Sequence, residues 1–446
     1  MELKSIKIQK LFGLFDYNIE LNNAENLTIL TGPNGYGKTT ILNIIYNLFN
    51  QRFFYFQKLS FDSISFHFSE NRRIDISKKD GKPKTEQRVQ IINNTQQIVV
   101  YQIPAIDIQI DLFVENNRVE TFVYNAEAEN QLVLELGKYI PVQKISQNTI
   151  LDNRTGNQLS VREFLIENSA MLPAKVIDLV NEQGNQLLQS LNSTNVYLIR
   201  EQRLLTQPLL NNKVSFANTI DQYAKELKEL IANKQFDAYQ VTQKLDSSFP
   251  KRLIECKKDL QKDEFDDRFA KLIEKQKQLQ QFGISTSEQG VTEYNKDTAK
   301  VLSVYLDDSE KKIGVYDDLL SKIELFVNIL NEKRFAFKSI VINSSQGFYF
   351  QTSNGQKLNL TDLSSGEQQE VVLLYELLFK TNPNTLILID EPEISLHVIW
   401  QKSFIRDLQK IAKMKQISFF VSTHAPQIIN DRWDLTRDLF DLANIK

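Results

Sequence analysis

The sequence predicts an α/β protein: a mixed, largely parallel sheet with flanking helices, joined to an antiparallel β subdomain and interrupted by a helical insertion. Three observations predict this class. A strand, a glycine-rich loop and a helix follow one another at residues 26–48. The last hundred residues alternate helix and strand, as half of a parallel sheet does. Between about residues 205 and 334, apolar residues instead recur at helical spacing.

Composition limits the classes of protein that this chain can be. Its 446 residues are 41% hydrophobic and 24% charged, which is typical of a globular protein with a large core. No apolar run approaches the roughly 18 residues that span a bilayer. A single cysteine, Cys256, excludes an internal disulfide framework and a thiolate zinc site. We therefore expect a cytoplasmic protein without a membrane segment.

The charge balance also carries information. A net charge of −3 argues against a protein that coats nucleic acid through a basic surface, although it leaves local DNA contact open. The segment 72–88 is locally rich in arginine and lysine. We interpret it as a solvent-exposed hairpin, with phosphate contact as the alternative.

The chain divides into three predicted segments: an N-terminal lobe at 1–204, a helical insertion at 205–335 and a C-terminal lobe at 336–446. In the first lobe, strands at 63–68 and 72–77 precede an Asp-Gly turn at 79–82, and helices resume near residue 160.

Pro250, Gly283 and Gly290 are expected to break the insertion into several helices. The insertion is too short for the long coiled coil of chromosome-structuring proteins, and it lacks a Cys-x-x-Cys hook. After it, strands are expected at 337–343, 347–351 and 358–360.

The pattern Gly-x-x-x-x-Gly-Lys-Thr at Gly32–Thr39 predicts a phosphate-binding loop. Glycines let successive backbone N–H groups turn toward phosphates, and the N-terminus of the following helix adds to the attraction. Lys38 is expected to reach the β- and γ-phosphates of ATP, and the Thr39 hydroxyl to ligate Mg²⁺.

Two acids end a buried apolar strand at Thr385–Pro392. The carboxyl end of a strand is where open α/β sheets bind ligands. Asp390 suits the shell of a Mg²⁺ ion, and Glu391 is placed to polarise the water that attacks phosphorus.

Four further segments resemble motifs of ABC-type ATPases. Leu363-Ser364-Ser365-Gly366-Glu367 resembles the signature motif, which implies that Ser364 and Gly366 bind the γ-phosphate of ATP held by a second protomer. Ser365 and Glu367 depart from the usual Gly and Gln. Ser422-Thr423-His424 resembles the switch segment, which implies that His424 contacts the γ-phosphate and the attacking water. Gln202 resembles the Q-loop glutamine that senses Mg²⁺ and water, and Ser395-Leu396-His397 matches the D-loop.

The expected site combines catalytic, metal-binding and nucleotide-binding residues. Catalytic roles fall to Glu391, His424 and Gln202, and metal contacts to Thr39, Asp390 and Gln202. The residues expected to contact the nucleotide are Gly32, Asn34, Gly35, Gly37, Lys38, Thr39, Thr40, Ser364 and Gly366.

About 350 residues separate Lys38 from Asp390, and two lobes around a helical insertion resemble the SMC/RecF-like ATPases, an AAA-family group. The segments 196–203, 246–252, 363–396 and 422–433 are similar to ATPase subunits of bacterial anti-phage systems such as Septu (PtuA) and, more distantly, to PARIS and retron-linked ATPases. This resemblance implies an ATPase that forms a homodimer, or a higher oligomer, through sandwiched ATP; the rate of hydrolysis, which can be very slow in such proteins, stays open.

Two functions from different classes stay open. In one, the protein is a sensor and scaffold that controls a separate nuclease or toxin during phage infection. In the other, it is a genome-maintenance ATPase that clamps DNA directly. The segment 246–252 is either a partner-docking surface or a solvated helix junction.

Overall fold

The computed structural model describes a large part of the chain. The described ranges are 2–80, 84–92, 95–103, 106–124, 137–138, 140–145, 149–153, 158–160, 164, 186–199, 205–206, 209–210, 213–214, 217–257, 260–284, 293–332, 335, 337–394 and 396–445. Within these residues no helix combines the length and the apolar character needed to cross a membrane.

A parallel five-stranded sheet forms the centre of the molecule. Its strands, in spatial order, are β13 (Asn195–Ile199), β21 (Thr385–Asp390), β22 (Ser418–Ser422), β3 (Leu27–Thr31) and β23 (Thr436–Asp438). Both faces of the sheet are buried, because Leu386 and Leu388 enter one core while Ile387 and Ile389 enter the other. Every neighbour of β3 comes from the far end of the sequence.

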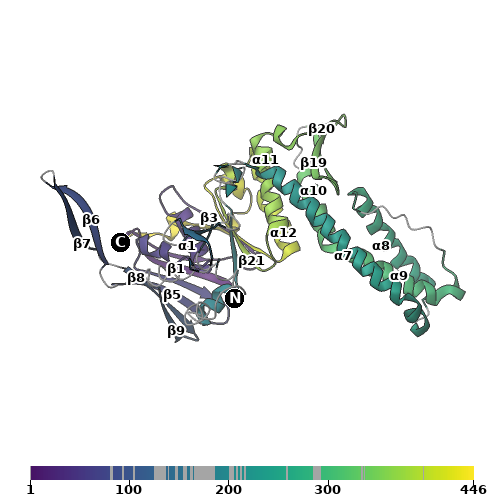
Figure 1. The fold of residues 1–446 in the computed structure, drawn as a ribbon, viewed down its shortest axis with the longest axis horizontal. Coiled ribbons are helices and arrows are strands. Elements are labelled where there is room, and N and C mark those ends of the chain that lie inside the picture. Colours follow the sequence, from purple (N-terminus) through teal and green to yellow (C-terminus); the bar gives the residue numbers. More distant parts are fainter. Residues whose placement is uncertain are drawn as a thin grey trace.

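An antiparallel seven-stranded sheet lies next to it. Its strands, in order, are β24 (Asn444–Ile445), β2 (Phe15–Glu20), β1 (Leu3–Leu11), β4 (Ser63–Phe68), β5 (Arg72–Asp80), β8 (Ile106–Val114) and β9 (Asn117–Tyr124). Helix α1 (Lys38–Phe49) contributes Ile41, Ile44 and Leu48 to the core shared by the two sheets. Helix α1 thus lies between the two sheets, which places its first residues next to the end of β3 (Figure 1).

The second core covers the other face of the parallel sheet. It is built by α11 (Ser365–Tyr375), the π-helix η4 (Glu376–Lys380), α12 (Val398–Lys415) and the sheet of β18 (Lys338–Asn343), β19 (Gly347–Thr352) and β20 (Lys357–Leu358). The α/β class with parallel, antiparallel and helical parts is therefore confirmed.

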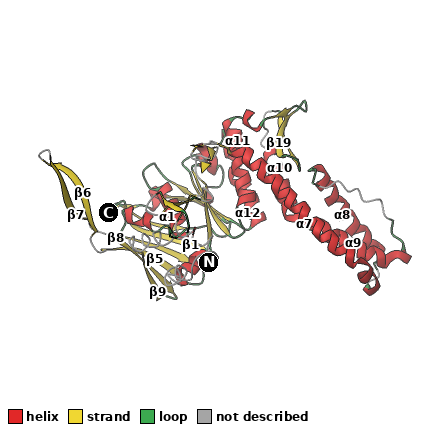
Figure 2. Ribbon diagram, in the orientation of Figure 1, coloured by secondary structure: helices red, strands yellow, loops and turns green. Residues whose placement is uncertain are grey.

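A helical arm extends from this second core (Figures 1 and 2). It comprises α7 (Thr219–Glu255), α8 (Lys262–Gln281), α9 (Ala299–Gly314) and α10 (Asp317–Glu332). The base of α7 shares the second core, where Tyr223 stacks on Tyr375 with ring centroids 4.5 Å apart. The tip has a small core of its own that includes Leu260, Phe265 and Leu306.

Pro250 does not break the insertion, contrary to the prediction, because α7 runs through it to Glu255. A proline inside a helix costs about 3 kcal/mol through the lost N–H and ring clash. Here Arg252 offsets part of that cost. Its guanidinium donates to both carboxylate oxygens of Asp308 on α9 and to the Leu245 carbonyl oxygen, the latter at 2.6 Å. Tertiary contacts therefore hold the final turn.

The predicted Asp-Gly turn at 79–82 is wrong for its first half. Lys79 and Asp80 belong to β5 and pair with Asp107 and Ile106 of β8, because cross-strand pairing extends the strand past the sequence signal. Gly81 and Lys82 lie outside the described residues.

The remaining elements are short or peripheral. They are α2 (Phe54–Lys58), β6 (Lys84–Ile92), β7 (Thr95–Ile103), β10 (Val142–Lys144), β11 (Thr149–Asp152), β12 (Gln158–Ser160), α6 (Gln186–Asn192), β14 (Leu205–Thr206), β15 (Leu209–Leu210), β16 (Lys213–Val214), β17 (Ala217–Asn218), α13 (Pro426–Ile429) and α14 (Leu439–Leu442). The helix expected near residue 160 is preceded by strand β12, and most of 161–185 lies outside the described residues.

Candidate nucleotide site

The glycine loop between β3 and α1 has a backbone that only glycine adopts easily. Gly32, Gly35 and Gly37 have φ angles of 141°, 89° and 92°. A Cβ at Gly37 would meet Leu11 at 3.0 Å, and one at Gly32 would meet Leu439 at 3.0 Å. The conformation therefore favours glycine at all three positions, and close packing adds to this at Gly32 and Gly37. The loop presents its N–H groups at the start of α1.

Lys38 is held inside this loop. Its side chain is buried, and the ammonium donates to the carbonyl oxygens of Gly32 at 2.9 Å and Pro33 at 3.3 Å. Asn34 and Gly35 at the tip of the loop are exposed, while Thr40 lies within the first turn of α1. The loop therefore combines one ammonium group with several backbone N–H groups, a combination that suits a polyphosphate.

Thr39 and Asp390 meet across 351 residues of sequence. The Thr39 hydroxyl donates to Asp390 Oδ1 at 3.2 Å, and the Ser422 hydroxyl donates to the same oxygen. Asp390 is buried at the end of β21. A hydroxyl and a carboxylate oxygen are hard ligands of the kind that Mg²⁺ takes alongside phosphate oxygens, so this pair fits the ion.

Glu391 follows Asp390 in a left-handed backbone conformation, with φ at 41°, which is uncommon for a residue other than glycine. Its backbone N–H donates to the Ser422 carbonyl oxygen at 3.0 Å, which fixes the turn. Burial and the negative charges of Asp390 and Glu393 raise the pKa of the Glu391 carboxyl, although His424 and Lys38 oppose them. A carboxyl with a raised pKa is a stronger base.

His424 lies beside two acids. Its Nδ1 is 3.0 Å from Glu393 Oε1 and 3.8 Å from Glu391 Oε1. Glu393 also accepts hydrogen bonds from the Thr423 hydroxyl at 2.8 Å and the His424 backbone N–H at 2.9 Å. Sequence reasoning missed Glu393, because the residue reads as part of the linker after the strand; only its burial and its contact with His424 single it out.

The signature-like segment lies at the start of α11. Ser364 caps the helix in a reciprocal pair with Glu367, whose Oε2 accepts the Ser364 backbone N–H at 2.8 Å. Burial alone would raise the pKa of Glu367, but hydrogen bonds from Lys338 and Ser364 outweigh it and lower that pKa. Lys338 Nζ lies 2.9 Å from each carboxylate oxygen. The glutamate at this position is thus a buried structural anion.

Ser364 and Gly366 open onto a cavity of about 300 Å³. Its lining residues come from the start of α11 and the segment before α12: Ser364, Ser365, Gly366, Gln369, Ile394, Leu396, His397 and Trp400. The structure therefore brings the signature-like segment and the D-loop-like segment together. No glycine-loop residue lines this cavity. Gln202 and Ser395, which were predicted to contribute, lie outside the described residues.

Aromatic residues beside the glycine loop were not anticipated. The Tyr36 ring lies 5.1 Å from that of Phe15 and 6.0 Å from that of Phe440, between centroids. Phe440 belongs to a C-terminal segment that returns to the loop, where Thr31 donates to Asp438 Oδ2 at 2.8 Å. This exposed apolar surface could hold the base of a nucleotide, whose flat faces stack on aromatic rings.

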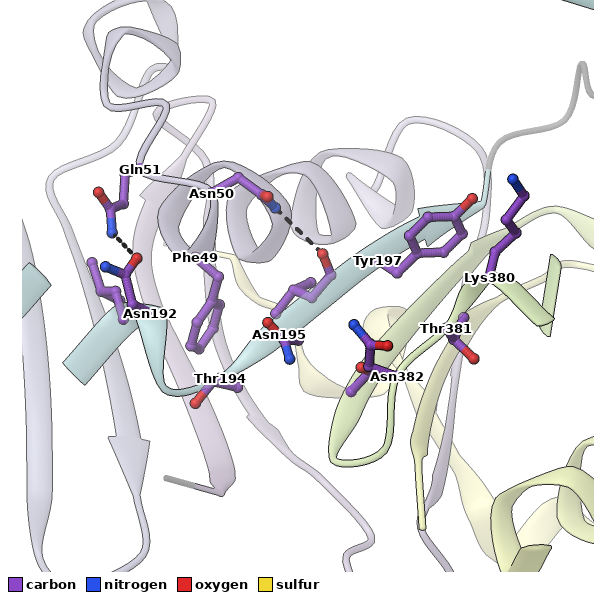
Figure 3. Close-up of a pocket in the computed structure, with 13 residues that line it drawn as sticks. Phe49, Asn50, Gln51, Asn192, Thr194, Asn195, Tyr197, Lys380, Thr381 and Asn382 are labelled. Carbon is purple, nitrogen blue, oxygen red and sulfur yellow. Dashed lines mark hydrogen bonds between the residues drawn. The ribbon is translucent and has the colours of Figure 1, made fainter. Parts of the chain in front are cut away.

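A separate cavity of about 290 Å³ lies at the opposite ends of the same strands (Figure 3). It is bordered by the last turn of α1, the start of β13 and the start of β21. Side-chain amides of Asn50, Gln51, Asn192, Asn195 and Asn382 face it. It is distinct from the phosphate loop, because parallel strands present Asp390 at their other end.

In the basic segment 72–88, most of the arginine and lysine side chains that the structure describes contact other groups of the protein. Arg73 pairs with Asp75 at 3.0 Å and lies over the Phe113 ring, while Arg72 lies 3.4 Å from Glu70. Lys78 donates to the Gln57 carbonyl oxygen at 3.4 Å. These contacts argue against a phosphate-binding patch, and the predicted hairpin is wrong for Arg72–Asp80, which forms an inner strand between β4 and β8.

Comparisons with known proteins agree with this geometry at the level of family. A family model described as "AAA ATPase domain" matches residues 1–429. A probable ATPase of retron Ec83 from Escherichia coli is 35% identical over 86 residues, which cover 17% of this chain and 16% of that relative. The match thus spans about one sixth of the relative's length.

Among solved structures, the chain is similar to SMC head domains. The Pyrococcus furiosus head with an extended coiled coil, bound to the C-terminal domain of ScpA, matches at 11% identity with a TM-score of 0.35; the match covers 96% of this chain and 91% of that one. The Thermotoga maritima head domain matches at 11% identity with a TM-score of 0.34, over 97% and 93%. Since the family model spans nearly all of the sequence, the chain belongs to the AAA ATPase domain family.

Proposed function

We propose that the protein binds ATP with Mg²⁺, hydrolyses it slowly, and uses the bound nucleotide to join two copies of the chain. The observation that carries this proposal is the position of the signature-like segment. Ser364 and Ser365 are exposed at the start of α11 and line a cavity that contains no residue of the glycine loop. This position supports a contact between an ATP on the glycine loop and Ser364 and Gly366 of a second copy.

Such a dimer would have two equivalent sites. Each would pair the glycine loop of one copy with the start of α11 of the other, so the contact is isologous. Backbone N–H groups and the Ser364 hydroxyl at that helix start suit the γ-phosphate. ATP would close the pair and loss of the γ-phosphate would open it, which makes the assembly a nucleotide-controlled switch.

The proposed hydrolysis step uses the acids at the end of β21. Glu391 takes a proton from water as the water oxygen attacks the γ-phosphorus, and the bond from that phosphorus to the bridging oxygen breaks to leave ADP. Lys38 and the loop N–H groups stabilise the charge on the phosphates. Thr39 and Asp390 would hold a Mg²⁺ ion, which would neutralise the phosphate oxygens further. His424 contacts the γ-phosphate.

We further propose that the dimer controls a separate effector, a nuclease or toxin, in anti-phage defence. The matched relative is named as a retron ATPase, which supports a role beside another component. The helical arm, with its own core at the tip, offers a rigid surface for such a partner.

Mass spectrometry of proteins retained by tagged Glu391→Gln protein, expressed with its neighbouring genes, tests this. The Lys38→Ala variant, which should not bind ATP, is the matched control. A stoichiometric nuclease or toxin-like protein retained only by Glu391→Gln is the expected result. Recovery of DNA alone, released by salt, would instead favour a DNA-clamping ATPase.

A further inference from the structure

Glu393 is a buried acid whose contacts converge on the switch segment. Its side chain is 7% exposed. One oxygen, Oε1, accepts the Thr423 hydroxyl and the His424 backbone N–H, and lies 3.0 Å from His424 Nδ1. Glu391 is farther from the same nitrogen, at 3.8 Å, which is too long for a hydrogen bond. Glu393 is therefore close enough to accept a hydrogen bond from His424 Nδ1, and Glu391 is not.

The chemistry of a carboxylate decides where the imidazole carries its hydrogen. An ionised carboxylate can only accept, so the nitrogen beside Glu393 must donate. The neutral ring is then protonated at Nδ1 and has a free lone pair at Nε2. The His424 side chain is half exposed (51%), so this ring remains accessible although the acid that orients it is not.

We propose that Glu393 is a positioning residue for ATP hydrolysis: it holds the His424 imidazole as the Nδ1–H tautomer, with Nε2 presented to the γ-phosphate. This inference rests on the proposed function. A ring that carries a proton on Nε2 as well would donate that N–H to a γ-phosphate oxygen, and the Glu393 carboxylate would stabilise its charge. Glu391 is then left free for the attacking water, so each acid has one task.

Steady-state kinetics test whether Glu393 acts through His424. We expect Glu393→Ala to lower kcat about 10- to 100-fold with KM for ATP nearly unchanged, as for other carboxylates that orient a functional histidine. Glu393→Gln keeps a carbonyl acceptor and should retain much of the activity. Glu332→Ala, which removes an exposed acid far from the site, is the matched control and should leave kcat unchanged.

The double variant provides the decisive comparison. If Glu393 acts through the histidine, Glu393→Ala has no further effect on kcat in a His424→Ala background. Losses that multiply in the double variant would overturn the proposal. Thermal denaturation of each variant separates this result from misfolding, since Glu393→Gln preserves the contacts with Thr423.

The tautomer can be measured without turnover. The chain has three histidines, so ¹⁵N-labelled imidazoles can be assigned with one variant each. We expect His424 to show Nδ1–H in the wild type and to lose it in Glu393→Ala. An Nε2–H signal for His424 in the wild type would refute the inference. Absent ATPase activity with the expected tautomer would instead count against the proposed function alone.

Discussion

Glu391 occupies a backbone position that few side chains tolerate. Its left-handed φ of 41° directs it away from the course of β21, and the Ser422 carbonyl oxygen holds the turn. Conformations of this kind persist where surrounding structure enforces them, and they cluster at functional sites. The chain thus places an acid with a raised pKa beside the Asp390 and Lys38 side chains.

Glu391→Gln should separate nucleotide binding from turnover. The amide keeps the shape of the side chain but cannot take a proton from water, so kcat should fall at least about 100-fold. ATP should then hold the dimer closed, and size-exclusion chromatography with light scattering should show twice the monomer mass. Wild-type turnover in this variant would remove Glu391 from the role of base.

The same residue should make stability depend on pH in the nucleotide-free protein. Because its pKa is raised on folding, the folded state binds more protons than the unfolded state between the two pKa values, and stability falls as pH rises through that window. Above it, Glu391→Gln should have a higher Tm than the wild type. The difference should vanish below about pH 4, where the carboxyl is protonated in both states. A Tm difference that is equal at pH 4 and pH 8 would contradict this.

At the scale of elements, the start of α11 combines a structural cap with a surface for a second molecule. Ser364 satisfies the first turn through Glu367, and Lys338 neutralises that acid from β18. The exposed side of the same turn opens onto the cavity beside His397 and Trp400. A substitution that keeps the helix but fills this space should therefore affect only assembly.

Ser365→Arg, at an exposed residue that lines the same cavity but takes no part in the cap, is the substitution that tests this. We expect the variant to bind a fluorescent ATP analogue as the wild type does, because its own glycine loop is intact, yet to stay monomeric with ATP. Analytical ultracentrifugation reports the assembly. Ser345→Arg, at an exposed turn of the β18–β19 hairpin, is the matched control and should still dimerise. Dimers of Ser365→Arg would place the interface elsewhere.

Local signals made part of this site predictable. The glycine loop between a strand and a helix and the acids that end β21 depend on neighbours within a few residues, so their local structure could be predicted. Glu393 could not be recognised, because its burial depends on His424, which is distant in sequence. Pro250 inside α7 was mispredicted for a similar reason, since Arg252 and Asp308 support the helix from another element.

At the scale of the whole molecule, the central sheet interleaves the two ends of the chain. Strand β3 pairs with β22 and β23, both of which follow residue 417. Thr39 and Asp390 meet only because this interleaving brings β3 and β21 into one sheet. Composition and motif order indicate the fold class, but the return of 436–445 to the glycine loop has no local signal and emerges only from the tertiary structure.

A fragment of residues 1–204 should therefore not fold alone. Strand β3 would have two unpaired edges, and α1 would lose one of its two covering sheets. We expect no cooperative thermal transition by circular dichroism. Co-expression with residues 205–446 should restore one. A sharp transition in the isolated fragment would show that the antiparallel sheet suffices to support α1.

The order of strands in the central sheet also determines how long β3 remains without its partner strands during synthesis. The ribosome makes Asp390 351 residues after Thr39, which takes about 20 to 70 s at roughly 5–20 residues per second. During this interval β3 has been translated but its partners have not. The nascent chain must therefore keep an apolar strand from pairing with other chains, and translation speed or chaperone supply should govern its yield in the cell.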